Sequence, residues 1–432
     1  MAAPTNVELN EQFQRALTLM ENSSAHVFVT GKAGTGKSTL LEYFRAHTRK
    51  KVAVLAPTGV AALNVRGQTI HAFFRFQADV TVDKVLGSNK RKGAIYKKLD
   101  AIVVDEISMV RADILDCMDA FLRLHGPKEK LPFGGVQMIL IGDLHQLPPV
   151  VSGEEKEAFR QHYQSEYFFD AKVFGQMRLE FIELEKIYRQ KDQEFIRFLN
   201  AVRNNTVNDK DLALINTRVN AHFQADPRNF FLTVTPTNAL AAEINKQNLG
   251  KIPGQLLTYH GSVEGQFGNQ YLPTDTELMV KVGAQVMMVN NDSHGRWVNG
   301  SIGHLQRLRQ IEGEADDLLV KLSDGGEEWV QPYTWELFKL SYNDQSKSLE
   351  SQGIGSFTQY PFRLAWAVTI HKSQGKTFQK VIIDFGHGMF AHGQAYVALS
   401  RCTSLDGVVL KRPLEKRHVS TDWRVERFLK NV

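Results

Sequence analysis

The segment HVFVTGKAGTGKS, residues 26–38, decides the fold. Its apolar first half is typical of a buried strand, and residues 31–38 match the phosphate-binding loop that joins a strand to a helix. The glycines let backbone N–H groups surround a phosphate, and the following helix directs its positive N-terminal end toward the anion. We therefore predict that Lys37 reaches the β- and γ-phosphates of a nucleotide and that Ser38 ligates Mg²⁺. A chance glycine-rich turn is the alternative, and the flanking strand and helix patterns count against it.

The rest of the chain continues this alternation of strands and helices. Apolar runs at residues 52–55, 101–104, 138–141 and 230–234 alternate with helical patterns such as 38–46 and 114–124, which predicts an α/β fold with doubly wound parallel sheets. Between about 280 and 355, short strand-like runs are separated by Asn-Asp-Ser, Gly-Glu and Asp-Gly-Gly turns. This change predicts a small antiparallel β insertion, after which the α/β pattern resumes at 381–384 and 407–410.

Two more polar segments follow predicted strands. Asp105 and Glu106 come directly after the strand at 101–104. We predict that Asp105 holds Mg²⁺, directly or through water, and that Glu106 orients and deprotonates the attacking water. An acidic pair after a strand is often only a solvated loop, but a phosphate loop in the same α/β pattern favours the catalytic interpretation. The strand at 138–141 ends in a turn stiffened by two prolines, which would place the amide of Gln146 near the γ-phosphate unless it is simply a rigid turn.

Composition limits the possible classes of protein without choosing among them. The chain has 432 residues, which is enough for two or three domains, and no apolar run approaches the ~18 residues of a membrane-spanning helix. The first residues lack the pattern of a signal peptide, and Cys117 and Cys402 match no metal or redox spacing, so we expect an intracellular protein with ordinary thiols. A net charge of +5 permits a nucleic-acid partner but does not require one.

Further blocks identify a family resemblance. In order along the chain, they are APTGVAA (56–62), TIHAFF (69–74), VDEISM (104–109), GDLHQLPP (142–149), YRQ (188–190), TPTN (235–238), AVTIHKSQG (367–375) and YVALSR (396–401). They resemble the motifs of helicase superfamily one, B branch, and most closely the PIF (petite integration frequency) family, which is related to the RecD helicases. Residues 108–150 resemble the signature region of that family, and the resemblance spans about 9–402.

The resemblance implies a domain arrangement and an ATP site. Two RecA-like P-loop NTPase domains are expected at 1–183 and at 184–279 with 356–432, with ATP in the cleft between them. A small wedge insertion is expected at about 65–98, and a small β-barrel insertion of the Src-homology-three type at 280–355. Arg189 and Arg401 would act as arginine fingers from the second domain. Gln14, or alternatively Gln12, would read adenine. The other implied ATP contacts are Gly34, Thr35, Gly36, Lys37, Ser38, Thr39 and Gly375.

The resemblance also implies a track for single-stranded DNA. Small donors would contact phosphates and imidazoles would stack on bases. The residues concerned are Thr58, His71, Thr237, Asn238, Thr369 and His371. For the two histidines, packing within the fold is the alternative. A basic segment with Lys90, Arg91, Lys92, Lys97 and Lys98 is either a solvated excursion or a nucleic-acid contact.

The implied function is that of an ATP-dependent DNA helicase with ATP and Mg²⁺ as cofactors. It would move 5′ to 3′ on single-stranded DNA as a monomer, open duplex and forked DNA, and extend to G-quadruplex or hybrid structures. One alternative is a DNA-stimulated ATPase that remodels protein–DNA complexes without separating strands. A second is a passive single-strand binder with a vestigial nucleotide site, which the intact set of catalytic residues argues against. The lack of long extensions outside the motor core favours a bacterial or phage-like source, in the cytoplasm and associated with the nucleoid.

Overall fold

The computed structural model describes residues 7–77, 79–87, 94–151, 153, 155–310, 313, 315–343, 348–386 and 391–432. The chain divides into two compact units. The first unit comprises Met1–Tyr188, Leu337–Ile354 and Trp423–Val432, and the second comprises Arg189–Glu336 and Gly355–Asp422. In the basic segment, Lys90, Arg91 and Lys92 lie outside the described residues, whereas Lys97 and Lys98 are exposed. The domain limits and the wedge that the sequence suggested stay predictions.

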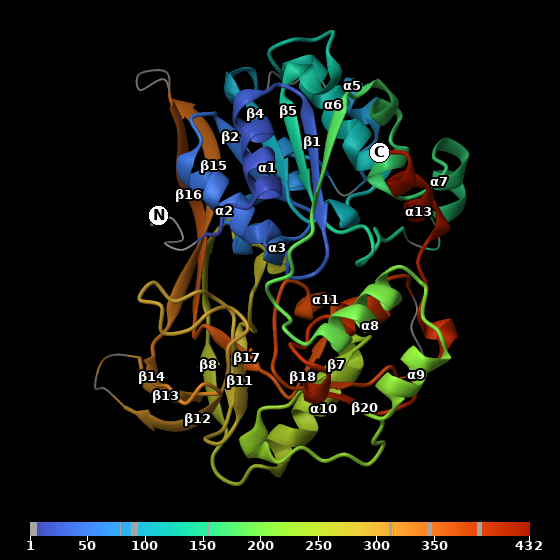
Figure 1. Ribbon diagram of the computed structural model, residues 1–432. Coiled ribbons are helices and arrows are strands. Elements are labelled where there is room, and N and C mark those ends of the chain that lie inside the picture. Colours follow the sequence, from blue (N-terminus) through green and yellow to red (C-terminus); the bar gives the residue numbers. More distant parts are fainter. Residues whose placement is uncertain are drawn as a thin grey trace. The chain divides into compact units, whose positions relative to one another are not determined.

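A six-stranded parallel sheet forms the centre of the first unit (Figure 1). Its order is β3-β2-β4-β5-β1-β6. The strands span β1 (His26–Gly31), β2 (Val52–Ala56), β3 (Gln68–Thr69), β4 (Ala101–Val104), β5 (Gln137–Ile141) and β6 (Leu179–Leu184). The buried parallel strands predicted at 26–30, 52–55, 101–104 and 138–141 are thus confirmed. The sequence does not predict β6, because LEFIEL is neither a continuous apolar run nor a regular alternation, and the strand is only partly buried.

Alternate residues of these strands supply two separate hydrophobic cores. Val27 of β1 faces one core and Phe28 faces the other, as expected when a sheet is covered on both sides. In the first core the strands pack against α1 (Glu11–Asn22) and α2 (Lys37–His47), which Figure 1 shows lying over one face of the sheet. The second core contains α6 (Ala112–His125) and part of α13 (Trp423–Lys430). The remaining helices of this unit are α3 (Gly59–Asn64), α4 (Ile70–Phe74), α5 (Val82–Leu86) and α7 (Lys156–His162).

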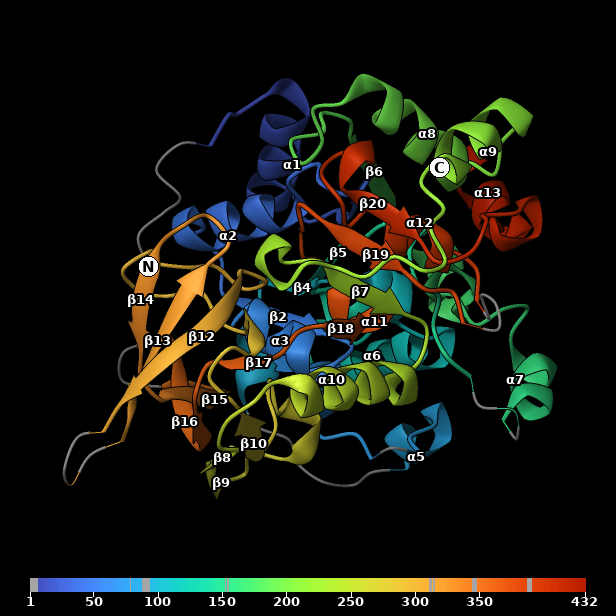
Figure 2. The same cartoon turned by 90° about the horizontal axis from the view of Figure 1, so that it is seen from below.

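The second unit contains a smaller parallel sheet in the order β18-β7-β19-β20. Its strands span β7 (Leu232–Thr235), β18 (Ala367–Thr369), β19 (Val381–Ile383) and β20 (Val408–Leu410). Figure 2 shows α10 (Asn238–Lys251) alongside β7 and β18. The other helices are α8 (Gln193–Arg203), α9 (Asp209–Asn216), α11 (Ile370–Ser373) and α12 (Gln394–Leu399). The predicted return of the α/β pattern after the β insertion is confirmed by β19 and β20.

Antiparallel strands make up the region where the sequence pattern changes. One sheet has the order β14-β13-β12-β11-β17 and encloses a core with Trp297 and Leu305. Its strands span β11 (Gln285–Met288), β12 (Ile302–Arg309), β13 (Asp317–Leu322), β14 (Glu327–Val330) and β17 (Phe362–Leu364). Smaller sheets are formed by β8 (Leu257–His260) with β10 (Glu277–Val280), and by β9 (Ser262–Gly265), β15 (Tyr333–Asn343) and β16 (Ser348–Gln359). The antiparallel character of the insertion is therefore confirmed.

In the part of the chain that the structure describes, no helix combines the length and the apolar composition needed to cross a lipid bilayer.

Candidate active site

The phosphate loop has the geometry that its glycines predict. Gly34 and Gly36 have φ angles of +84° and +90°, a left-handed backbone that other residues rarely adopt. Gly36 is the N-cap of α2, so Lys37, Ser38 and Thr39 form the first turn of that helix. The first N–H groups of a helix lack an intrahelical acceptor, and they are the donors that bind phosphate. The loop is therefore shaped to hold an anion at the carboxyl end of β1.

Two side chains stabilise the loop from within. Lys37 Nζ donates to the carbonyl oxygens of Gly31 and Lys32, at 2.7 and 3.0 Å. Thr35 is buried, and its hydroxyl donates to the Lys32 carbonyl at 2.9 Å. Ser38, in contrast, is exposed on the first turn of α2, where its hydroxyl can reach a ligand held by the loop.

The acidic pair lies close to the loop lysine. Asp105 follows β4, and its N–H donates to the Leu55 carbonyl of the neighbouring strand at 2.9 Å. Burial and the Glu106 carboxylate raise the pKa of Asp105 above its ordinary value, whereas the charge of Lys37 lowers it. A carboxylate with this surplus of negative charge beside it attracts a cation. The structure thus brings together Lys37, Asp105 and Glu106 as predicted.

The same donors fit Mg²⁺ better than a metal with an all-protein cage. Within the described ranges, no group of three or more His, Cys, Asp or Glu side chains could hold a metal ion. Mg²⁺ is commonly bound by one or two carboxylates together with nucleotide phosphates. Asp105 and the exposed hydroxyl of Ser38 match that donor set.

Glu106 is held in a strained conformation. Its φ and ψ angles are +51° and +44°, which is uncommon for a residue with a side chain. The turn that follows, Ile107–Met109, packs against Gly142 at the end of β5: a Cβ added to Gly142 would lie 2.9 Å from Ile107 Cγ2 and 3.1 Å from Ile107 N. The position of Glu106 therefore depends on the segment that carries Gln146.

A buried carboxylate orders that third segment. Asp143 is fully buried, and its oxygens accept from the N–H of His145 at 3.2 Å and from Gln146 Nε2 at 3.3 Å. Gln146 is 7% exposed, so its amide is held by packing as well as by Asp143. The sequence predicted the role of Gln146 but gave no sign that Asp143 positions it.

Three polar atoms in these segments lack a hydrogen-bond partner. They are buried, and within the described residues Thr30 Oγ1, Ser108 Oγ and His145 Nδ1 form no hydrogen bond, although His145 Nδ1 lies 3.5 Å from Asp143 Oδ1. Such atoms are rare in folded proteins and gather where water or a ligand completes the site. Their positions, one in each segment of the predicted nucleotide site, support the assignment of the site.

Gln14 and Gln12 are the two glutamines that the sequence suggests for reading adenine, and they have different surroundings in the structure. Gln14 is exposed, and its amide donates to the Leu9 carbonyl at 2.8 Å. Gln12 is half-buried and donates to Glu185 at 2.9 Å. Glu185 lies close in the chain to Tyr188, whose N–H donates to the Gly34 carbonyl at 2.9 Å. The structure therefore favours Gln12 over Gln14.

Tyr188 is a further candidate that we did not assign to the ATP site. Its ring is 44% exposed and lies 3.9 Å from the position that a Cβ on Gly36 would take. An exposed ring beside the phosphate loop is suited to pack against a nucleotide base. Tyr188 is part of the YRQ block (188–190), but the family resemblance assigned a role only to Arg189 of that block.

The two predicted arginine fingers meet the same segments of the second unit. Arg189 donates to the carbonyl oxygens of Ser400 at 3.2 Å and Gly375 at 3.4 Å. Arg401 is 1% exposed; its guanidinium donates to Val397, to the Ser400 hydroxyl, and to the 373–376 segment. The structure thus brings Arg189, Arg401 and Gly375 together within this unit. Arg401 would have to exchange several hydrogen bonds in order to bind a phosphate.

The predicted DNA residues lie at the carboxyl ends of neighbouring strands in each unit. Thr58, Thr237 and Thr369 are N-caps of α3, α10 and α11, and each hydroxyl accepts from a backbone N–H of its own helix. Asn238 opens α10, and His71 and His371 lie in the first turns of α4 and α11. Each hydroxyl is the acceptor in its cap, and a hydroxyl that accepts still has a proton to donate. These segments can therefore offer phosphates both threonine O–H groups and helix N–H groups.

Known proteins resemble this chain along nearly its whole length. The model of the PIF1-like helicase family matches residues 6–213. An ATP-dependent DNA helicase Pif1 of Bdellovibrio bacteriovorus is 30% identical over 415 residues, which cover 94% of this chain and 88% of that protein. The chain belongs to the PIF1-like helicase family. The PIF1-like assignment agrees with the resemblance seen in the sequence motifs.

Solved structures support the family and the fold. A crystal structure of Bacteroides sp Pif1 in complex with ADP-AlF4 is 35% identical, covers 99% of this chain and 97% of that one, and has a TM-score of 0.89. A crystal structure of Bacteroides Pif1 bound to ssDNA is also 35% identical, with a TM-score of 0.71 over 99% of this PIF1-like chain. The predicted α/β fold with RecA-like domains is thereby confirmed.

Proposed function

We propose that this PIF1-like helicase hydrolyses ATP on the loop 31–38 and uses the energy to move 5′ to 3′ along single-stranded DNA and open duplexes. The family makes the chain an ATP-dependent DNA helicase. The proposal that ATP is hydrolysed on this loop rests on one observation: the left-handed glycine loop, Lys37 and the acidic pair lie together at the carboxyl ends of β1 and β4. The direction of movement follows from the branch of superfamily one that the motifs resemble.

Each segment of the nucleotide site has a proposed role. Lys37 leaves its two carbonyl acceptors to bind the β- and γ-phosphates, which are stronger, charged acceptors. Asp105 and Ser38 hold Mg²⁺, which neutralises phosphate charge when it is bound. Glu106 orients and deprotonates the attacking water, and Gln146 contacts the γ-phosphate.

Guanidinium groups complete the proposed chemistry. In phosphoryl transfer, charge spreads over the equatorial oxygens of the γ-phosphate, and an arginine finger that stabilises it is worth about 10³ to 10⁵ in rate. Arg189 is only partly buried and can exchange its partners more readily than the enclosed Arg401, so Arg189 is proposed as the main finger. Gln12 and Tyr188 are proposed to recognise the adenine, with Gln14 as the alternative.

The proposed DNA track uses the strand ends of both units. Thr58 and His71 belong to the first unit, and Thr237, Asn238, Thr369 and His371 belong to the second. Phosphates would bond to the N–H groups of the helix starts, and the exposed His371 would stack on a base. The Bacteroides relative is bound to ssDNA in its crystal structure, which supports the same ligand here.

A strand-displacement assay with tailed duplexes tests the direction. We expect ATP-driven unwinding of a duplex with a 5′ single-stranded tail and none of the same duplex with a 3′ tail. Lys37→Ala is the control, because loss of the ammonium removes phosphate contacts and abolishes hydrolysis. Unwinding of the 3′-tailed substrate alone would contradict the proposal.

The same assay extends to the remaining proposals on substrate and assembly. We propose that forked DNA is opened and that G-quadruplex or hybrid structures are additional substrates, with a monomer as the active form. Unwinding rates proportional to protein concentration support a monomer, whereas a second-order dependence supports an assembly.

A further inference from the structure

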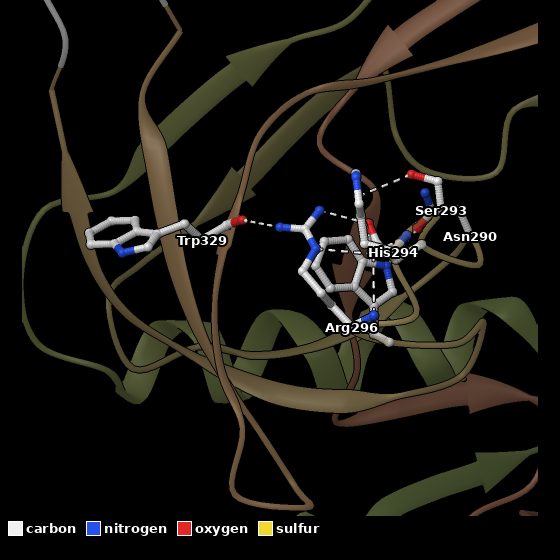
Figure 3. Close-up of polar contacts among 7 residues, drawn as sticks. Asn290, Ser293, His294, Arg296 and Trp329 are labelled. Carbon is white, nitrogen blue, oxygen red and sulfur yellow. Dashed lines mark hydrogen bonds and ion pairs between the residues drawn. The ribbon is translucent and has the colours of Figure 1, made fainter.

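The loop 290–300 of the second unit, between β11 and β12, is held by a network of side-chain hydrogen bonds. Asp292 Oδ2 accepts from the N–H groups of His294 at 2.9 Å and Arg296 at 3.2 Å. The Arg296 guanidinium returns to both carboxylate oxygens, at 3.0 and 2.6 Å. Figure 3 shows the same guanidinium reaching the backbone carbonyl of Trp329, a bond of 3.1 Å to the edge strand β14. These bonds close the loop on itself and attach it to the sheet.

A buried tryptophan anchors the other side of the loop. Trp297 is 5% exposed and belongs to the core of the β insertion, and its Nε1–H donates to Asn290 Oδ1 at 2.9 Å. The Arg296 guanidinium stacks on the same indole, 4.4 Å from the ring centroid. Figure 3 also shows the contact between Ser293 and His294 in the same loop. Together these contacts hold the loop in one conformation.

What the loop holds out is an apolar side chain on a tight turn. Val298 is 62% exposed although it follows the buried Trp297. Its N–H donates to Ser301 Oγ at 3.1 Å, and its carbonyl accepts from the Ser301 N–H at 2.9 Å. The next residue, Asn299, is fixed by a bond from its N–H to Asn291 Oδ1 at 2.8 Å. Val298 therefore presents an exposed apolar surface from a backbone that cannot easily move.

The turn is attached to a lysine in a candidate DNA segment. Lys376 Nζ donates to Asn299 Oδ1. The lysine stem also packs on the turn, since a Cβ on Gly300 would lie 3.4 to 3.6 Å from the Lys376 side-chain carbons. Lys376 directly follows Gly375 and the segment with Thr369 and His371. The rigid turn and the predicted track are thus in contact within one unit.

Cations gather beside this contact. Burial lowers the pKa of Lys376 to about 8, with the charge of Arg363 as the second cause. Burial and the charge of Arg363 also lower the pKa of Lys372, whereas the charge of Asp275 raises it. Lys376, Lys372 and Arg363 therefore carry three positive charges against the single negative charge of Asp275. A bound anion would reduce the repulsion among the three cations.

We infer that the turn Val298–Asn299–Gly300–Ser301 and Lys376 form a subsite for single-stranded DNA. Lys376 bonds a backbone phosphate while Val298 packs against the adjacent base or sugar. A cation and an apolar side chain in fixed positions match the alternation of phosphates and base faces along an unpaired strand. This inference rests on the proposed function and adds a gripping element that no helicase motif of this chain contains.

Two variants of the full chain test the subsite at pH 7. We expect Val298→Ser to weaken binding of a fluorescein-labelled oligothymidylate about 5-fold, since the apolar contact is lost. Lys376→Met should weaken binding about 10-fold and reduce the slope of log affinity against log salt concentration by about 0.7, one phosphate contact on a single strand. ATP hydrolysis without DNA should stay at the wild-type rate in Val298→Ser, which also shows that the variant is folded.

Matched controls come from the same unit. Val282 is an exposed valine and Lys210 an exposed lysine outside the subsite, so Val282→Ser and Lys210→Met should bind as the wild type does. The inference would be overturned if Val298→Ser and Lys376→Met both bound oligothymidylate with the affinity and salt slope of the wild type. It would also be overturned if these variants lost affinity only for blunt duplex DNA. If the wild type itself bound no oligothymidylate, the proposed function would fail instead.

Discussion

Arg189 and Arg401 show how burial separates two residues that the motifs treat alike. Arg189 donates to the Ser400 carbonyl, and Arg401 donates to the Ser400 hydroxyl and the Val397 carbonyl. Arg401, however, is 1% exposed, whereas Arg189 is only partly buried. A guanidinium that is fully enclosed and bonded to carbonyl oxygens stabilises the fold, and its removal leaves those acceptors without donors. A partly exposed one can change partners.

We expect the two alanine variants to fail in different ways. Arg189→Ala should keep its nucleotide affinity and thermal stability but lose turnover by about 10³-fold or more. Arg401→Ala should lower the stability of the second unit by about 2 to 4 kcal/mol, because buried acceptors lose their donor. Nucleotide binding, steady-state hydrolysis and thermal unfolding separate these outcomes.

The highly exposed Arg228 supplies a control for the loss of an arginine as such, since its ion pair with Asp226 lies at the surface. Wild-type thermal unfolding of Arg401→Ala together with a large loss of turnover would instead make Arg401 the finger.

At the same scale, the sequence predicted residue types better than contacts. Loop and strand patterns fix where Lys37, Asp105, Glu106 and Gln146 lie, and their roles stay predictions. The choice between Gln12 and Gln14 was not possible, because both lie at the start of an amphipathic helix and differ in the acceptor that the amide meets. Asp143 was missed as a positioning residue because a buried carboxylate has no pattern of its own.

At the scale of elements, the turn after Glu106 and the end of β5 are packed without spare room. Gly142 is required because any Cβ there would press on the backbone of Ile107 and Ser108, 3.1 and 3.3 Å away. A side chain can rotate away from such a contact, but backbone atoms cannot. The turn, and with it Glu106, would have to shift.

We therefore expect Gly142→Ala to reduce the turnover number for ATP about 10- to 100-fold while nucleotide affinity stays close to that of the wild type. Steady-state kinetics and titration with a fluorescent nucleotide distinguish the two quantities.

Gly175→Ala is the matched control in the same unit, since nothing lies within 4 Å of the added Cβ. An unchanged turnover number in Gly142→Ala would show that the turn can move without disturbing catalysis.

Secondary structure was predictable where an apolar run or a helical period was long enough. The strand predicted at 101–104 spans the same residues in the structure, and the helix predicted at 114–124 forms the interior of α6. Short helices such as α3 and α4 were not predicted, since each is stabilised mainly by its N-cap and by packing. The rigidity of the loop 290–300 also depends on contacts with β14, which no local pattern reveals.

At the scale of the whole molecule, the last segment, Trp423–Val432, belongs to the first unit, although the segment directly before it, Gly355–Asp422, belongs to the second. Val425 of α13 is 1% exposed, and Phe428 stacks on Phe169 with ring centroids 4.4 Å apart. Phe428 also contacts Phe174 and Phe28 in the same core. The sequence predicts one domain from 184–279 and 356–432, because a short amphipathic helix does not show in its sequence which core it joins.

We expect Phe428→Ala to lower the stability of the first unit by about 2 to 4 kcal/mol through the cavity left among the aromatic rings. Trp423→Ala on the same helix is the control, since Trp423 is 65% exposed and its loss should change little. Thermal unfolding with and without nucleotide measures both. Equal melting of Phe428→Ala and the wild type would mean that α13 contributes nothing to that core.

The two carbonyl bonds of Lys37 have a consequence for ligand choice. The Lys37 ammonium already donates to the carbonyl oxygens of Gly31 and Lys32. A ligand that replaces these carbonyls is therefore bound only if its own oxygen is a stronger acceptor than a peptide oxygen. A neutral sugar or base offers no stronger acceptor, whereas an ionised triphosphate does. If Lys37 binds phosphate as proposed, the loop selects ligands by their charge and needs no steric barrier against uncharged metabolites.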